Sequence, residues 1–192
     1  MLMKVFPHGT GEGDKPSRYL VRPDYPGRDT APPQVLRGDP AMTRALIDSI
    51  ERRWKFTSGV LSWHPDEKIS EAQEEEVMDA FERVAFAGLE ADQRNILWVR
   101  HTHAGHHELH FLIPRLELSS GKDFNACPPG WQKDFDVFRD LFNWREGWAR
   151  PDDPARARDE LPKKADLFKA RMARWGKEIR ESDRDRAKEV IH

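Results

Sequence analysis

The chain has 192 residues, a length that fits one domain with an appendage. Its 32 Lys and Arg nearly balance its 34 Asp and Glu, so the net charge of −2 neither indicates nor excludes a nucleic-acid partner. The single cysteine, Cys127, excludes an internal disulfide, and no apolar stretch approaches the roughly 20 residues of a membrane span. We expect a soluble, cytoplasmic protein.

The first third of the chain predicts two strands, a long loop and a helix. Residues 2–6 are typical of a strand, and residues 7–39, rich in Gly, Pro, Asp and Arg, are predicted to form the loop. A loop of this length in a compact domain tends to carry function. Asp39 and Pro40 then supply an N-cap and a first-turn proline for a helix that ends near residue 53. A strand follows over 57–63.

The middle of the chain predicts a second helix and two neighbouring strands. Ser70 and Gln73 form a capping box, and the apolar spacing behind them indicates a helix that ends near residue 88. The next strand ends at His101, and its apolar start suits a central strand whose end opens at a site. Another strand is predicted over 106–118.

Residues 119–122 predict a turn, and one further short strand after it is an open alternative. An amphipathic helix with two apolar stripes comes next, so we expect a helix that is buried on a wide arc. One stripe is Trp131, Phe135, Phe138 and Phe142, and the other is Val137, Leu141, Trp144 and Trp148.

This order of elements predicts an α+β fold in which helices pack on an antiparallel sheet. We assign residues 1–150 to this domain. Residues 151–192 follow a Pro-rich break and are predicted to form a charged helical extension, which could begin a longer chain. The apolar stripe of the extension, formed by Phe168, Met172, Trp175 and Ile179, is typical of a packing face.

Five of the eight histidines lie within ten positions, 101–110, and flank a predicted hairpin turn at Ala104 and Gly105. In that register His101 lies opposite Glu108, Val99 opposite His110, and His103 opposite His106. Alternation then gives one face a set of possible ligands, which are His101, His103, His106, Glu108 and His110. Imidazoles and a carboxylate on one face indicate a metal site, with a merely polar hairpin as the alternative. The spacing is not that of a zinc-protease helix.

The chain has only two tyrosines, Tyr19 and Tyr25, and both lie in the predicted loop near Arg18, Arg22 and Arg28. A phenol, with a pKa of about 10, is a poor nucleophile until a cation or a base assists it. Beside a metal hairpin, these tyrosines are candidate nucleophiles. Plain packing is the alternative for either one.

These features together resemble the plasmid mobilisation relaxases of the HUH endonuclease superfamily. The resemblance covers roughly residues 1–150 and depends on the hairpin, on Tyr19-Leu20 and on the segment 36–40. It is similar to the subgroup whose metal triad is His, Glu and Asn, because His101 to Glu108 is a step of seven residues and Glu108 to His110 a step of two. The chain departs from the subgroup at the Asn position, which is His110, and at an acidic position, which is His103.

The resemblance implies a five-stranded antiparallel sheet and a strand-specific DNA nickase that starts plasmid mobilisation. Tyr19, or alternatively Tyr25, would attack a phosphodiester at the origin of transfer and stay linked to the 5′ phosphate. The implied metal ligands are His101, Glu108 and His110, with His103 and His106 as auxiliary groups. The implied ion is Mg²⁺ or Mn²⁺, although Zn²⁺ or Ni²⁺ could also bind there.

The implied partners are single-stranded DNA at the origin, accessory proteins of the relaxosome and the coupling protein of a type IV secretion system, with transfer of the protein alongside the DNA. Single strands are held by cations and aromatic rings. The candidate cations near the site are Arg18, Arg22, Arg28, Arg37, Arg100 and Arg115.

Three other functions stay open at this point. An HUH replication initiator or a transposase-like nuclease would use the same chemistry. A zinc hydrolase of a small molecule or peptide would not need Tyr19. A DNA-binding accessory protein with a vestigial site would bind DNA without cutting it.

Overall fold

The computed structural model describes residues 1–150, which fall within one compact unit, Met1–Pro151. The predicted helical extension and its apolar stripe lie outside the described residues. Within the described range the elements follow the order β1 (Leu2–Val5), α1 (Asp14–Val21), β2 (Gln34–Arg37), α2 (Pro40–Asp48), β3 (Phe56–Ser62), α3 (Glu71–Ala85), the 3₁₀ helix η1 (Ala91–Gln93), β4 (Leu97–His101), β5 (Glu108–Pro114) and α4 (Gln132–Glu146).

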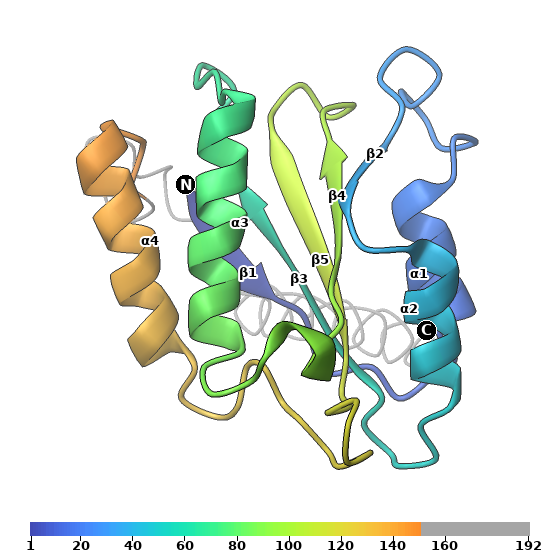
Figure 1. Cartoon of the computed structure of the whole chain (residues 1–192). Helices are drawn as coiled ribbons and strands as arrows, with labels where there is room; N and C mark the ends of the chain where they lie inside the picture. Colours follow the sequence, from blue (N-terminus) through green and yellow to red (C-terminus); the bar gives the residue numbers. More distant parts are fainter. Residues whose placement is uncertain (151–192) are drawn as a thin grey trace, which may run out of the picture. The chain divides into compact units, whose positions relative to one another are not determined.

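The five strands form one sheet in the order β1-β3-β5-β4-β2, and every pair is antiparallel (Figure 1). The long strands β3 and β5 pair over their whole length and, with β4, make the middle of the sheet. The short strands β1 and β2 are its two edges. The α+β prediction with a five-stranded antiparallel sheet is therefore confirmed.

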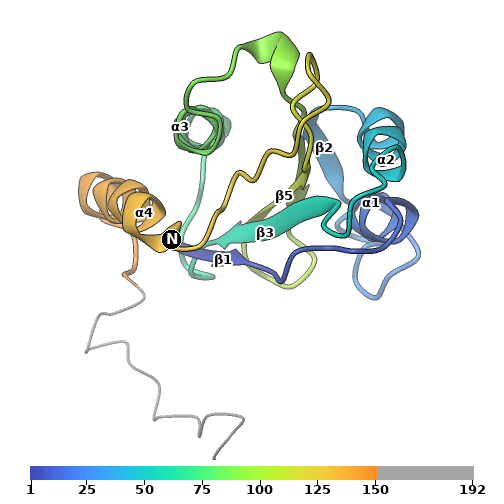
Figure 2. The same ribbon diagram turned by 90° about the horizontal axis from the view of Figure 1, so that it is seen from below.

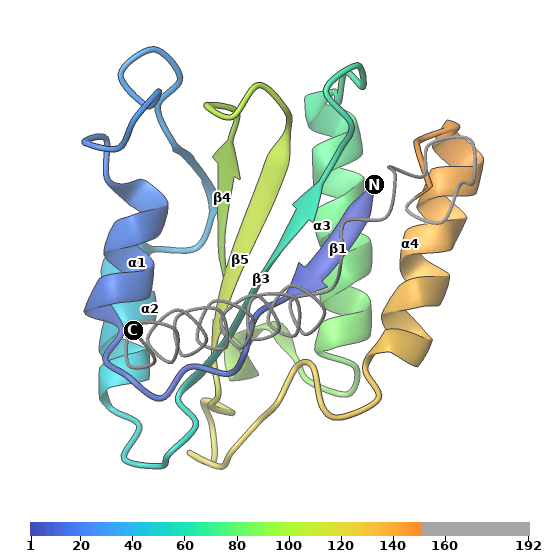
Figure 3. The same cartoon turned by 180° about the vertical axis from the view of Figure 1, so that it is seen from behind.

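Helices cover both faces of the sheet, with α3 and α4 on one side and α1 and α2 on the other (Figure 2). Because side chains alternate along a strand, each strand supplies both cores. The core under α3 and α4 contains Phe81, Trp98, Leu109 and Phe111. The smaller core under α1 and α2 contains Leu20, Ile47, Leu97, Val99 and Leu112. Figure 3 shows the second face, where α1 lies beside β4 and β5.

Two helix starts follow from side chains that satisfy free backbone N–H groups. The Asp39 carboxylate accepts the Met42 N–H at 2.7 Å, with Pro40 at the first helical position of α2. Ser70 and Gln73 form the reciprocal capping box that begins α3. Both predicted caps are confirmed. No helix among the described residues is long and apolar enough to cross a membrane.

The predicted loop over 7–39 is wrong in two places, because it contains α1 and the edge strand β2. Helix α1 has only eight residues, of which Leu20 is the one buried apolar side chain, so no apolar stripe indicates it. Strand β2 has only four residues and pairs with β4 through an irregular register. Contacts between residues far apart in the sequence stabilise both elements, and hydrophobic periodicity does not reveal such contacts. No strand follows the turn at 119–122 within the described residues.

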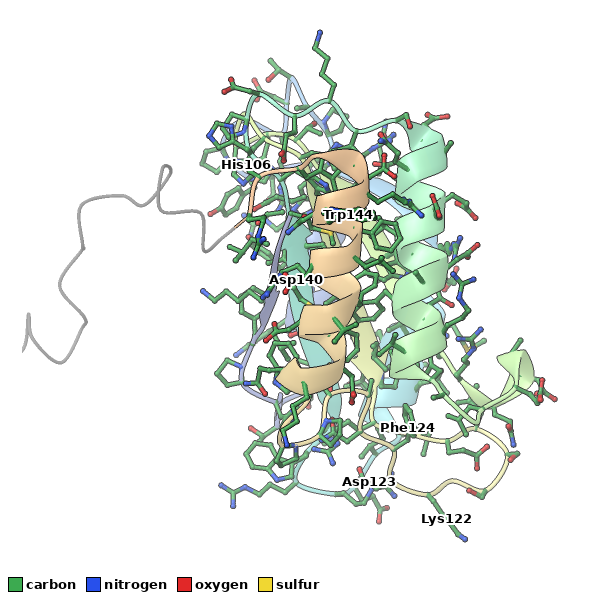
Figure 4. The ribbon with its side chains drawn as sticks, turned by 90° about the vertical axis from the view of Figure 1, so that its left-hand side faces the viewer. His106, Lys122, Asp123, Phe124, Asp140 and Trp144 are labelled. Carbon is green, nitrogen blue, oxygen red and sulfur yellow. The ribbon has the colours of Figure 1, made fainter. Side chains whose placement is uncertain are left out.

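The second stripe of α4 is also not buried as predicted. Val137, Leu141 and Trp144 are 69%, 55% and 80% exposed, and Figure 4 labels Trp144 on the outward side of the helix. Only Trp148, beyond the end of α4, is buried. Along α4 itself the stripe of Phe135, Phe138 and Phe142 contacts the core, because α4 packs against α3 along one side.

Candidate metal and tyrosine site

The β4–β5 hairpin has the register that alternation predicts. His101 lies opposite Glu108, and Val99 lies opposite His110. The strands stop at the His101–Glu108 pair, so the connection spans residues 102–107 and not only Ala104 and Gly105. The expected pairing of His103 with His106 is therefore not part of the ladder. Gly105, with φ +79°, supplies the left-handed residue of this wider turn.

Three side chains of the hairpin converge on one point, and they are the three predicted ligands. One donor atom each from His101, Glu108 and His110 lie within 4.8 Å of one another. The two imidazole rings have centroids 4.4 Å apart, and both histidines are buried. Two imidazoles and a carboxylate suit a divalent cation.

The surroundings of Glu108 and His101 lower the pKa of both side chains, which favours the binding of a cation. The hydrogen bond from His110 lowers the pKa of Glu108 to about 2, so the carboxylate is ionised at neutral pH. Burial lowers the pKa of His101 to about 4, so this ring is neutral. Metal ligands must be deprotonated, and the lowered pKa values of Glu108 and His101 meet this condition. The residues present therefore fit a divalent ion.

The auxiliary histidines of the turn do not join this group of three. His106 Nε2 lies 3.0 Å from Glu108 Oε1, while His110 Nε2 lies 3.2 Å from the other oxygen, Oε2. Because a carboxylate only accepts, His106 donates and holds Glu108 in place. The His103 ring packs 5.3 Å from that of His101, and burial lowers the pKa of His103.

The last turn of α1 is attached to the hairpin through carbonyls that the helix itself leaves free. His101 Nε2 donates to the Leu20 carbonyl at 2.8 Å, and Arg28 Nη1 donates to the Tyr19 carbonyl at 2.6 Å. The same guanidinium donates to the Arg22 carbonyl and lies 3.4 Å from His101 Nδ1 through Nη2. His101, a predicted ligand, and the Arg28 cation therefore hold the segment that carries Tyr19.

Both tyrosines lie at this site. The Tyr19 ring is 6.3 Å from the His101 ring, and the Tyr25 ring is 5.6 Å from the His103 ring. The two phenol rings are 5.8 Å apart, and each residue is about two-fifths exposed. Tyr19 thus adjoins a predicted ligand, whereas Tyr25 adjoins an auxiliary histidine.

Arg28 lies between the two tyrosines and is 1% exposed. Its guanidinium carbon is 5.0 Å from the Tyr19 ring centroid and 4.8 Å from that of Tyr25. Within residues 1–150 no carboxylate forms an ion pair with it, and its Nε has no hydrogen-bond partner. Arg28 is therefore a buried cation inside the site, and its contact with DNA stays a prediction.

The other arginines divide between the rim and distant places. Arg18 is exposed on α1 and pairs with Asp14, and Arg22, just after α1, is half-buried and pairs with Asp24. Arg37 contacts carboxylates of α3, and Arg100 contacts Glu74, so both point to the opposite face of the sheet from the ligands. Arg115 pairs with Asp123 past the far end of β5, and Figure 4 shows Asp123 and His106 at opposite ends of the molecule. These three predicted contacts are not brought to the site.

Glu74 is a residue of the site that sequence reasoning missed. Its buried carboxylate lies 2.8 Å from Arg100 Nη1 and 2.6 Å from His107 Nε2, on the back of the hairpin. Arg100 and His107 are the immediate neighbours of His101 and Glu108, two predicted ligands, so one carboxylate joins the two sides of the hairpin on the opposite face. The sequence contains a signal for its burial, because Glu74 precedes Val77 by three residues and Phe81 by seven. This spacing places its carboxylate on the apolar face of the helix.

Three comparisons relate the chain to known proteins. A family model described as "Relaxase: MobA/VirD2-like, nuclease domain" matches residues 41–143. The chain is 40% identical over 170 residues to "Cryptic plasmid protein C" of Neisseria gonorrhoeae, covering 87% of this chain and 80% of that protein. It is 36% identical over 168 residues to "DNA relaxase MbeA" of Escherichia coli, covering 84% of this chain but 32% of MbeA. No solved structure gives a significant match.

Proposed function

Because the chain belongs to the MobA/VirD2-like relaxase nuclease-domain family, we propose that it nicks one DNA strand at a plasmid origin of transfer, with Tyr19 as nucleophile. The observation that carries the proposal is the contact of the tyrosine segment with the ligand cluster. His101 donates to the carbonyl of Leu20, and the ring of Tyr19, the preceding residue, lies 6.3 Å from the His101 ring. An exposed phenol beside a three-ligand cluster suits transesterification.

The reaction exchanges one phosphodiester for another. The bond between Tyr19 Oη and phosphorus forms while the bond from phosphorus to the 3′ oxygen breaks. The phenol loses its proton and the departing 3′ oxygen gains one, so this oxygen leaves as a hydroxyl. The 5′ phosphate stays on the enzyme. Attack by a 3′ hydroxyl reverses these steps and reseals the strand.

His101, Glu108 and His110 would hold the divalent ion. When bound, such an ion supplies alignment and charge neutralisation at the scissile phosphate. Imidazole nitrogens favour Mn²⁺ and later transition metals over Mg²⁺, which prefers oxygen ligands and retains its waters. His110 adds a second nitrogen to the set, so we assign Mn²⁺ as the better activator of this chain.

The other parts of the proposal concern DNA and location. Arg18, which is exposed, and Arg22, which is half-buried, are the candidate DNA contacts, and either can exchange its acidic partner for a backbone phosphate. The substrate is single-stranded DNA at the origin. Accessory relaxosome proteins, the coupling protein, and a cytoplasmic location before transfer with the DNA belong to the same proposal.

The test uses the full chain and single-stranded oligonucleotides that carry its cognate origin, in Mn²⁺ or in EDTA. We expect a covalent adduct that needs the metal and disappears in Tyr19→Phe. Tyr25→Phe is the matched control and should retain the adduct. Cleavage that persists in Tyr19→Phe without an adduct would favour a metal hydrolase, and binding without cleavage would favour an accessory protein.

A further inference from the structure

A cavity of about 340 Å³ adjoins the candidate site on the face that carries α1. Pro16 and Leu20 of α1 line it together with Phe6, which lies just after β1. Ser58 and Gly59 of β3 line it as well. Tyr19 and His110 also line it, so the cavity is continuous with the tyrosine and the ligand cluster.

The chemistry of the cavity matches one class of group. Its surface is mainly apolar, and its lining includes the aromatic residue Phe6 and the hydroxyl-bearing residue Ser58. A nucleobase has a flat π face that stacks on aromatic rings and a polar edge that accepts or donates hydrogen bonds. The Nζ of Lys4 lies 5.6 Å from the centroid of the Phe6 ring, and an ammonium can bind a backbone phosphate.

We propose that this cavity holds one unpaired nucleobase of a nucleotide that flanks the scissile phosphate, with Phe6 as the stacking wall. The proposal rests on the proposed nicking function for the identity of the strand. A paired base keeps its faces in the duplex stack, so only single-stranded or extruded bases can enter. The cavity therefore selects single strands and fixes the register of the phosphate against Tyr19.

The test places 2-aminopurine, one position at a time, along an origin oligonucleotide and measures its fluorescence with the full chain in EDTA, where cleavage is blocked. One position next to the nick should be quenched by stacking. Phe6→Ala should abolish that quenching and weaken binding roughly 10-fold or more. Phe6→Trp, which keeps a ring, should retain both. Trp144→Ala removes an exposed aromatic residue of α4 and should behave as the wild type.

The possible results separate this inference from the nicking function. Quenching at one position that depends on the Phe6 ring supports base binding in the cavity, whether or not an adduct forms. The absence of an adduct in Mn²⁺ would overturn the proposed nicking function alone. An adduct that forms while no position responds to Phe6→Ala overturns the cavity and leaves the nickase standing. Equal loss of quenching in Phe6→Ala and Trp144→Ala also overturns it.

Discussion

Glu74→Gln tests whether the contacts of Glu74 with Arg100 and His107 position the predicted metal ligands on the opposite face of the hairpin. The side chain of Glu74 is 3% exposed and that of Arg100 is 19% exposed, so the substitution leaves a largely buried cation without its carboxylate. Breaking a buried pair from one side costs about 3–5 kcal/mol. We take the lower end, because Gln34 still accepts from Arg100. That loss corresponds to a fall of roughly 6–12 °C in Tm.

Metal affinity is the second readout of the same variant. Residues that orient ligands from behind contribute about 10- to 100-fold to metal affinity, so Mn²⁺ should bind Glu74→Gln at least about 10-fold more weakly at a temperature well below Tm. Calorimetric titration measures this directly. Adding Arg100→Gln to Glu74→Gln removes the unpaired charge and should restore stability. It should not restore Mn²⁺ affinity, because the carboxylate that contacts both sides of the hairpin is still absent.

The matched control for this experiment is Glu76→Gln, on the same helix. Glu76 forms an exposed ion pair with Arg145, which is worth about 0–1 kcal/mol. We expect Tm and Mn²⁺ affinity close to wild type. If Glu74→Gln and Glu76→Gln gave the same Mn²⁺ affinity, the reasoning that joins the two faces of the hairpin would be refuted.

Three further substitutions test separate parts of the site. Glu108→Ala should abolish Mn²⁺ binding and nicking, while Glu117→Ala, past the far end of β5, should leave both intact; titration that shows equal binding in the two would contradict the ligand assignment. Arg28→Lys replaces the planar guanidinium that donates to the Tyr19 and Arg22 carbonyls, so adduct formation should slow roughly 10- to 100-fold with Mn²⁺ affinity unchanged. Because burial lowers the pKa of His101 from 6.5 to about 4, the unfolded chain binds more protons between these values, and stability should fall as pH drops through that window. His101→Gln should show a smaller fall in urea titrations, and an unchanged slope would count against this cause.

The hairpin was predictable because its information is local. Alternation places His101, Glu108 and His110 on one face, and Gly105 marks the turn, so neither conclusion needs knowledge of the rest of the chain. The caps of α2 and α3 are local in the same sense. A side chain three residues from a free N–H satisfies it whatever the tertiary structure.

Other features depend on contacts across the chain, which no local pattern records. Helix α1 is held by carbonyl contacts with His101 and Arg28, which lie 81 and 9 residues away from their partners. The direction in which Arg37 and Arg100 point is decided by carboxylates of α3, although both arginines looked like site cations in the sequence. The exposure of Trp144 depends on which side of α4 packs against α3. The sequence has two similarly apolar stripes on this helix, so it does not indicate which one is buried.

The nature of the covalent link is the most direct test of the account. The full chain is incubated with an origin oligonucleotide in Mn²⁺, the product is digested, and the nucleotide-bearing peptide is identified by mass spectrometry. We predict a 5′-phosphate linkage on the phenolic oxygen of Tyr19. A linkage on Tyr25, or cut DNA with no residue modified, would contradict the central claim.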